Sequence, residues 1–244
     1  MALLDRHREG EPTTGCPRTR RKVNVSEAII GRQSIRAFDP TRPVTDDLIL
    51  ALLDIAARAP SGSNIQPWHV YVVRGDRQKK ITAVCSERFL GGDEGDAEYH
   101  YYPKNWRQPY IGRRRETGFG LYGLLGIEKS DTKAVQDYRV TNYQFFGAPV
   151  ALFFTIDRDM ELGSWLDYGM FLQSLMLAAR DNGLETCPQA AFCPYYDSVM
   201  PLLEAPEEQM LVCAMSVGYP VAAALINTFR TSRLSADSFT QFVD

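Results

Sequence analysis

Two short segments in the first third of the chain carry residue types that bind a phosphate and a polar, flat ring. The first is Arg32-Gln33-Ser34-Ile35-Arg36, which places two guanidiniums and a hydroxyl close together. Arginine forms charge-assisted, bidentate hydrogen bonds with phosphate oxygens, and a serine hydroxyl adds a further donor. The segment therefore indicates a phosphate site, although a solvated surface turn has a similar composition.

The second segment follows a helical pattern and precedes a strand pattern. Its small and polar side chains offer donors and acceptors to a heteroaromatic edge, and its glycine permits a close approach of the backbone. A plain turn is the alternative, because each of these residue types also favours turns. The candidate binding residues are Pro60, Ser61, Gly62, Ser63, Asn64 and Gln66.

Composition excludes several other classes of function. The chain has 244 residues and a formal net charge of −3, so no global attraction to nucleic acid or to an anionic membrane exists. We expect neither partner. The five cysteines are scattered and odd in number, and only three histidines are present, which argues against a disulfide framework and a metal site. A cytoplasmic location is the expectation.

Residues 1–23 predict a flexible, polar N-terminal extension, because they mix charges and lack periodic apolar positions. Residues 24–244 predict a single domain in which helices surround a sheet of four or five strands. A buried helix over 165–179 is expected in the core or at a subunit interface. Helices are expected near 25–31, 45–59, 76–89, 131–143 and 165–179 and from about 194, and strands near 68–73, 149–156, 184–189 and 209–217.

Residues 91–126 show no clear period and concentrate aromatic residues and glycines. Two interpretations stay open for this excursion: a lid over a flat substrate, or a satellite cluster packed on the domain. If it is a lid, its candidate substrate contacts are Tyr102, Trp106, Tyr110 and Tyr122.

Gly118 to Gly123 within this excursion match the spacing of a dinucleotide-binding fingerprint. That fingerprint requires a buried strand before the first glycine, but residues 113–117 are charged. We therefore expect no Rossmann site here.

Both opening segments resemble the flavin mononucleotide (FMN) loops of the nitroreductase family, and the resemblance extends from residue 24 to the C-terminus. Residues 183–191 resemble the strand and loop whose backbone approaches the flavin ring, which adds Pro188, Gln189 and Ala190 as candidates. Some members carry an acidic residue where this chain has Ala190, so contacts on that face are expected from the main chain. Arg230 and Arg233 resemble the C-terminal basic residues that reach the FMN phosphate, Arg233 being the better match.

The resemblance implies an α+β fold of the nitroreductase type, with a central, mostly antiparallel sheet flanked by helices in an intertwined homodimer. Each FMN would lie at the interface, with Arg32, Ser34, Arg36 and Arg233 from one chain and residues 60–64 from the other. It also implies a ping-pong reaction at flavin N5, in which NADH or NADPH is the donor and a nitroaromatic compound the acceptor. No side chain is expected to act as catalyst, because the cofactor carries the chemistry.

Two alternatives stay open. Within the same fold, the chain could be a reductive dehalogenase or a quinone or enal reductase. Outside enzymology, the basic N-terminal arm could serve a non-enzymatic binding protein.

Overall fold

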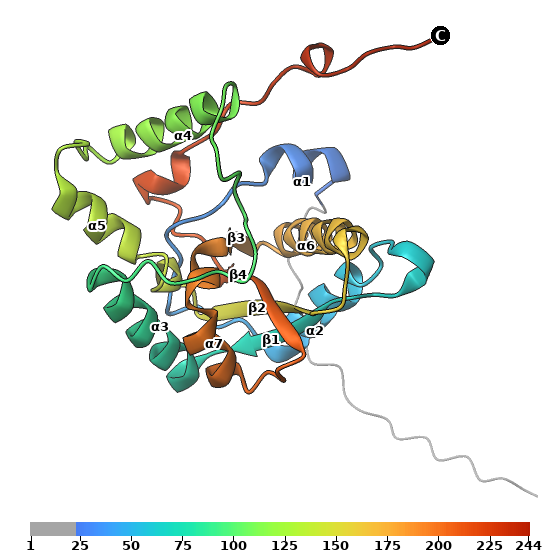
Figure 1. The fold of residues 1–244 in the computed structure, drawn as a ribbon, viewed down its shortest axis with the longest axis horizontal. Coiled ribbons are helices and arrows are strands. Elements are labelled where there is room, and N and C mark those ends of the chain that lie inside the picture. Colours follow the sequence, from blue (N-terminus) through green and yellow to red (C-terminus); the bar gives the residue numbers. More distant parts are fainter. Residues whose placement is uncertain (1–22) are drawn as a thin grey trace, which may run out of the picture.

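The computed structural model describes residues 23–244, and its centre is an antiparallel sheet (Figure 1). In this part of the chain the sheet has four strands in the order β1-β2-β4-β3, and every neighbouring pair is antiparallel. This confirms the mostly antiparallel sheet expected from the sequence. The strands are β1 (His69–Val73), β2 (Val150–Asp157), β3 (Glu185–Gln189) and β4 (Gln209–Gly218).

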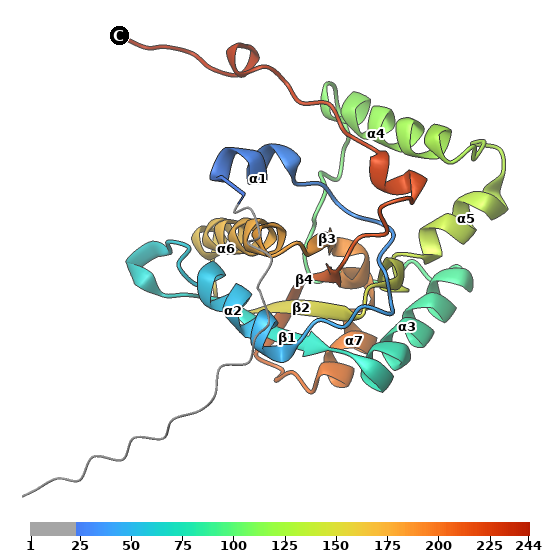
Figure 2. The same ribbon diagram turned by 180° about the vertical axis from the view of Figure 1, so that it is seen from behind.

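Helices cover both faces of the sheet. On one side lie α2 and α6, with α1 packed on α6, and on the other side lie α3, α5 and α7 (Figure 1, Figure 2). The helices are α1 (Val25–Gly31), α2 (Asp46–Ala56), α3 (Gly75–Leu90), α4 (Tyr110–Leu124), α5 (Thr132–Val140), α6 (Leu162–Asp181) and α7 (Tyr196–Leu203).

Strand β2 separates two apolar cores, which explains why its sequence is almost continuously apolar. Ala151 and Phe153 pack in the core under α3 and α7, whereas Leu152, Phe154 and Ile156 pack in the core under α2 and α6. Successive side chains of a strand point to opposite faces, so a strand covered on both sides needs apolar residues at every position. The expected buried strand near 149–156 is therefore confirmed.

Helix α4 corrects one expectation. Residues 110–124 form a helix, although the sequence showed no clear pattern between 91 and 126. The reason is that Leu121 is its buried residue, so the helix has no continuous apolar stripe. Gly118 to Gly123 lie inside this helix, and so do residues 113–117, where the dinucleotide fingerprint would require a strand.

The predicted extension over residues 1–23 lies outside the described residues, except for Val23. From Val23 to the C-terminus, no helix is long and apolar enough to cross a membrane.

Thr45 begins α2 as predicted, and its hydroxyl oxygen accepts a hydrogen bond from the backbone N–H of Leu48 at 3.3 Å. Replacing it by Ala removes this cap and is expected to lower the free energy of unfolding by about 1 kcal/mol. Urea denaturation at fixed protein concentration measures the change. Thr45→Ser keeps the hydroxyl and is the control; equal losses in both variants would contradict a capping role.

Candidate cofactor and substrate site

The Arg32–Arg36 segment runs along the free edge of β3. Ser34 forms a bridge with Thr186, and the backbone N–H of Ile35 donates to the carbonyl of Thr186 at 3.0 Å. The Ile35 side chain is 2% exposed, so it anchors the segment in the core. The polar residues on either side of Ile35 are thereby held at the surface beside β3.

A C-terminal segment fixes the other side of these residues. The Asn227 side-chain oxygen accepts a hydrogen bond from the Arg36 backbone at 2.9 Å, and its amide group donates to the Ala37 carbonyl at 2.8 Å. The Gln33 amide group donates to the Asn227 carbonyl at 2.8 Å, and Arg230 donates to the Gly31 carbonyl at 3.1 Å. Residues almost two hundred positions apart thus form one hydrogen-bonded unit, which spacing alone does not predict.

Positive charge accumulates in this unit. Burial lowers the pKa of Arg32, and the positive charge of Arg233 lowers it further, so the structure places these two predicted residues close together. Burial raises the pKa of the Cys187 thiol to about 11, and the charges of Arg36 and Arg32 oppose that rise. The guanidiniums of Arg32, Arg36 and Arg233 therefore act on the same small region at the start of β3. We call these three residues the arginine cluster.

One carboxylate enters the arginine cluster. Glu185 pairs with Arg180 of α6, and burial raises the pKa of Glu185 even though Arg180, Arg230 and Arg32 lower it. Because Arg180 already neutralises this carboxylate, positive charge remains in excess. Neither partner was among the predicted residues. The structure explains Gly31, because a Cβ there would lie 2.4 Å from the Arg180 guanidinium.

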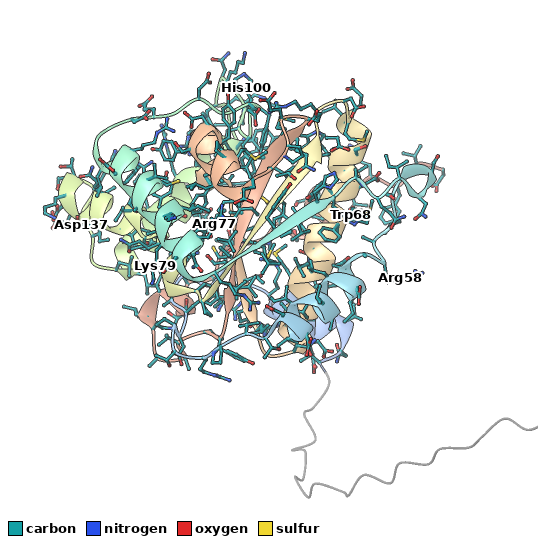
Figure 3. The ribbon with its side chains drawn as sticks, turned by 90° about the horizontal axis from the view of Figure 1, so that it is seen from below. Arg58, Trp68, Arg77, Lys79, His100 and Asp137 are labelled. Carbon is teal, nitrogen blue, oxygen red and sulfur yellow. The ribbon has the colours of Figure 1, made fainter. Side chains whose placement is uncertain are left out.

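The polar loop over residues 60–66 lies elsewhere. Gly62 of this loop bonds to Asp167 of α6, whereas Glu185 beside the cluster pairs with Arg180, which lies 13 residues further along α6, or about 20 Å along the helix. Arg58, just before the loop, and Asp137 of α5 lie on opposite sides of the molecule (Figure 3). Within one chain the loop and the arginine cluster are therefore not brought together.

The polar loop has a strained, well-defined backbone. Ser63, Asn64 and Gln66 adopt positive φ values of 50°, 60° and 52°. Such conformations are unfavourable for residues with a side chain and persist only when the surroundings impose them. Here Asp167 of α6, which is 8% exposed, accepts a hydrogen bond from the Gly62 backbone at 2.9 Å. Asp167 was not among the predicted residues, because its partner Gly62 lies 105 positions away in the sequence.

At the end of β3, the Gln189 side chain points inward. Its oxygen accepts from the Ser216 hydroxyl at 2.6 Å and its amide group donates to the Asn142 carbonyl at 2.6 Å. This candidate can therefore offer a ligand only its main chain. Pro188 and Ala190 are at least partly exposed and line, with Gln189, a cleft of about 850 Å³ that Tyr99, Tyr101, Tyr102 and Tyr143 also border.

The four aromatic candidates divide into two groups. Tyr102 and Trp106 are 5.4 Å apart between ring centroids, and Trp106 and Tyr110 border one hollow. Tyr122 is about 18 Å from Tyr110 along α4, given a rise of about 1.5 Å per residue. It contacts Tyr138, which lies close enough to Arg36 for that charge to affect its pKa.

Comparison with known proteins decides the family. The model of the nitroreductase family matches residues 29–219 of this chain. The chain belongs to the nitroreductase family.

Individual nitroreductases are similar over most of the chain. A 4-nitrobenzoate reductase of Pseudomonas putida is 39% identical, covering 88% of this chain and 93% of that protein. A chloronitrobenzene nitroreductase of Comamonas testosteroni is 35% identical, covering 90% and 96%. Among solved structures, the FMN and NADPH-dependent nitroreductase NfnB from sphigopyxis sp. strain HMH superposes with a TM-score of 0.88 at 35% identity, covering 91% of this chain and all of that one.

The arginine cluster fits the phosphate of FMN. A phosphate monoester carries up to two negative charges and accepts several hydrogen bonds, which suits guanidiniums that have no carboxylate partner in the described part of the chain. In addition, the side-chain oxygen of Gln33 is buried and has no donor within residues 23–244, so it is available to a ligand hydroxyl.

Replacing Arg32 or Arg36 by Ala is expected to weaken FMN binding about 10- to 100-fold, because each removes a charge-assisted set worth about 1.5 to 3 kcal/mol. Titration followed by flavin fluorescence measures the dissociation constant. Arg58→Ala, an exposed arginine outside the cluster, is the matched control. A wild-type protein that binds no added FMN would refute the assignment.

Proposed function

We propose that this protein is an FMN-dependent oxidoreductase that reduces nitroaromatic compounds with NADH or NADPH. The observation that carries the proposal is the arginine cluster, in which Arg32 and Arg233 lie close together and have no carboxylate of their own among residues 23–244. Family membership supports it, and so do the names of the relatives, which act on 4-nitrobenzoate and chloronitrobenzene.

The residues of the chain hold and orient the cofactor. Arg32, Ser34, Arg36 and Arg233 bind the phosphate, and the main chain of residues 188–190 supports the ring. When held there, FMN would supply hydride transfer from the nicotinamide and two-electron transfer to the acceptor. We assign no side chain as general acid or nucleophile; the protein positions the reactants and excludes competing reactions.

We further propose that the active unit is a homodimer with two equivalent sites. The polar loop over 60–66 is too far from the arginine cluster to serve it within one chain, so it serves the cluster of a second chain. Apolar side chains exposed on α1 and α6 support this, since exposed apolar patches mark interaction surfaces. Ile30 is 81% exposed, Leu162 84% and Leu166 71%.

The alternatives concern the acceptor. A dehalogenase or a quinone or enal reductase would use the same arginine cluster, so activity toward nitroaromatics, quinones and halogenated phenols distinguishes them. A non-enzymatic role would depend on the N-terminal arm, which lies outside the described residues. A cytoplasmic location stays a prediction.

Subunit mixing tests the shared site. Asn64→Ala and Arg36→Ala homodimers are each expected to bind FMN weakly. In a mixed dimer both changes fall on one site and the other is wild type, so random mixing of equal amounts restores roughly a quarter of the sites. FMN titration of the refolded mixture measures the recovery. Recovery no greater than in the unmixed parents would mean that each chain builds its own site.

Separate half-reactions test the reaction itself. The described residues form no dinucleotide fold, so donor and acceptor are expected to take turns at one site. Anaerobic NADPH or NADH should bleach the flavin absorbance, and a nitroaromatic added afterwards should restore it without further donor. Double-reciprocal plots are expected to be parallel. Intersecting plots, with a reduced enzyme that nitroaromatics fail to reoxidise, would refute the proposed function.

A further inference from the structure

The N-terminal end of α4 and the loop before it carry a patch of arginines and aromatic rings that the proposed function does not use. We call it the lid patch. It comprises Tyr102, Trp106, Arg107, Tyr110, Arg113 and Arg114.

The rings and guanidiniums of the lid patch are interleaved. The Arg114 guanidinium carbon lies 4.6 Å from the Trp106 ring centroid and 5.6 Å from that of Tyr102. The guanidinium carbons of Arg107 and Arg113 lie 4.8 Å and 5.7 Å from the centroid of the Tyr110 ring. A guanidinium lying over a ring keeps its N–H groups free for a second partner. A hollow of about 320 Å³ opens beside Trp106, Arg107 and Tyr110.

The charge of the lid patch is uncompensated within the described chain. Elsewhere in residues 23–244, Arg88 and Arg158 pair with carboxylates, but Arg107, Arg113 and Arg114 have no such partner. The one nearby carboxylate on α4, Glu116, accepts a hydrogen bond from Ser232 at 2.9 Å. Three guanidiniums held together on a chain of net charge −3 mark a local site for an anion.

The patch is open to solvent and offers flat apolar surface. Tyr102 is 57% exposed and Tyr110 44%. A ligand that combines a planar heteroaromatic ring with a phosphate matches this arrangement, because the ring stacks on an aromatic face while guanidiniums bind the phosphate.

We propose that the lid patch binds the adenosine 2′-phosphate of NADPH and makes the enzyme prefer NADPH to NADH. The inference rests on the proposed function, since it assumes a nicotinamide donor. The two donors differ only in that phosphate, so a site for it acts directly on their discrimination.

The position of the patch favours a donor over an acceptor. Ser232 bonds to Glu116 of α4 and so links this helix to the segment that carries Arg233 to the arginine cluster. The patch residues on α4 lie within two turns of this contact, about 10 Å along the axis. In an acceptor such as 4-nitrobenzoate the anion is one ring away from the reacting nitro group. A dinucleotide, by contrast, places its 2′-phosphate far from the nicotinamide. An open patch at the edge of the site can therefore bind this phosphate while the nicotinamide occupies the site.

The test compares the two donors. In anaerobic stopped-flow reduction of the FMN-loaded enzyme, the wild type is expected to favour NADPH by about 10- to 100-fold in the ratio of rate constant to half-saturating concentration. Arg114→Gln and Arg107→Gln should each move the NADPH to NADH ratio toward one. Arg115→Gln removes the same charge from the next position of α4, outside the patch, and should leave the ratio unchanged.

A binding measurement separates this proposal from the proposed function. Calorimetric titration of the wild type should show adenosine 2′,5′-bisphosphate binding at least about tenfold more tightly than adenosine 5′-monophosphate, with a difference that shrinks in high salt. Arg114→Gln should abolish the difference. This measurement needs no turnover, so it stands even if nitroaromatics are not the acceptors.

Three results would overturn the proposal. The first is a wild type that does not distinguish the donors or the two adenosine phosphates. The second is an Arg115→Gln variant as impaired as Arg114→Gln, which would indicate a general charge effect. The third is a loss in Arg114→Gln confined to 4-nitrobenzoate relative to nitrobenzene, which would assign the patch to the carboxylate of the acceptor.

Discussion

The structure depends on holding several guanidiniums together before any phosphate neutralises them. Mutual repulsion and burial both oppose this, as the lowered pKa of Arg32 shows. The fold counters these costs with hydrogen bonds that do not depend on the guanidiniums: Ile35 bonds to β3, and Asn227 bonds to the backbone of Arg36 and Ala37. A ligand phosphate at the cluster would remove the repulsion, and its binding energy would then stabilise the fold. At a ligand concentration 100 times the dissociation constant this amounts to about 2.7 kcal/mol.

The sheet makes this arrangement rigid. Strand β3 lies at one edge and offers its free side to the Arg32–Arg36 segment, while β4 behind it is buried along its length. The end of β3 is fixed as well, because both polar atoms of the Gln189 side chain are bonded inside the domain. One short strand thus positions the residues proposed to bind the phosphate at its start and the main chain proposed to support the ring at its end. Their separation is set by the strand and not by a flexible loop.

Much of the fold could be predicted from local patterns. Thr45, which precedes an apolar helical period, predicts the start of α2, and the apolar run over 149–156 predicts strand β2. Both patterns lie within the element that they predict or directly beside it. Helix α4 was not predicted from the sequence, because it packs against the C-terminal segment, where Gly120 lies against Phe229, and not against the main core. The same limit applies to the site. Arg180, Glu185 and Asp167 act through partners distant in sequence, so no spacing rule identifies them.

The parts of the candidate site also differ in how freely their residues can be substituted. The arginine cluster and the end of β3 are built on the sheet, and the polar loop is held by α6 through Asp167, so these parts have little freedom to vary. Helix α4 has one buried residue, Leu121, and exposes most of its aromatic and cationic side chains. Substitutions there cost little stability, because few of these side chains support a core. If FMN supplies the chemistry as proposed, selection among donors and acceptors can be changed in α4 without disturbing the parts proposed to bind FMN.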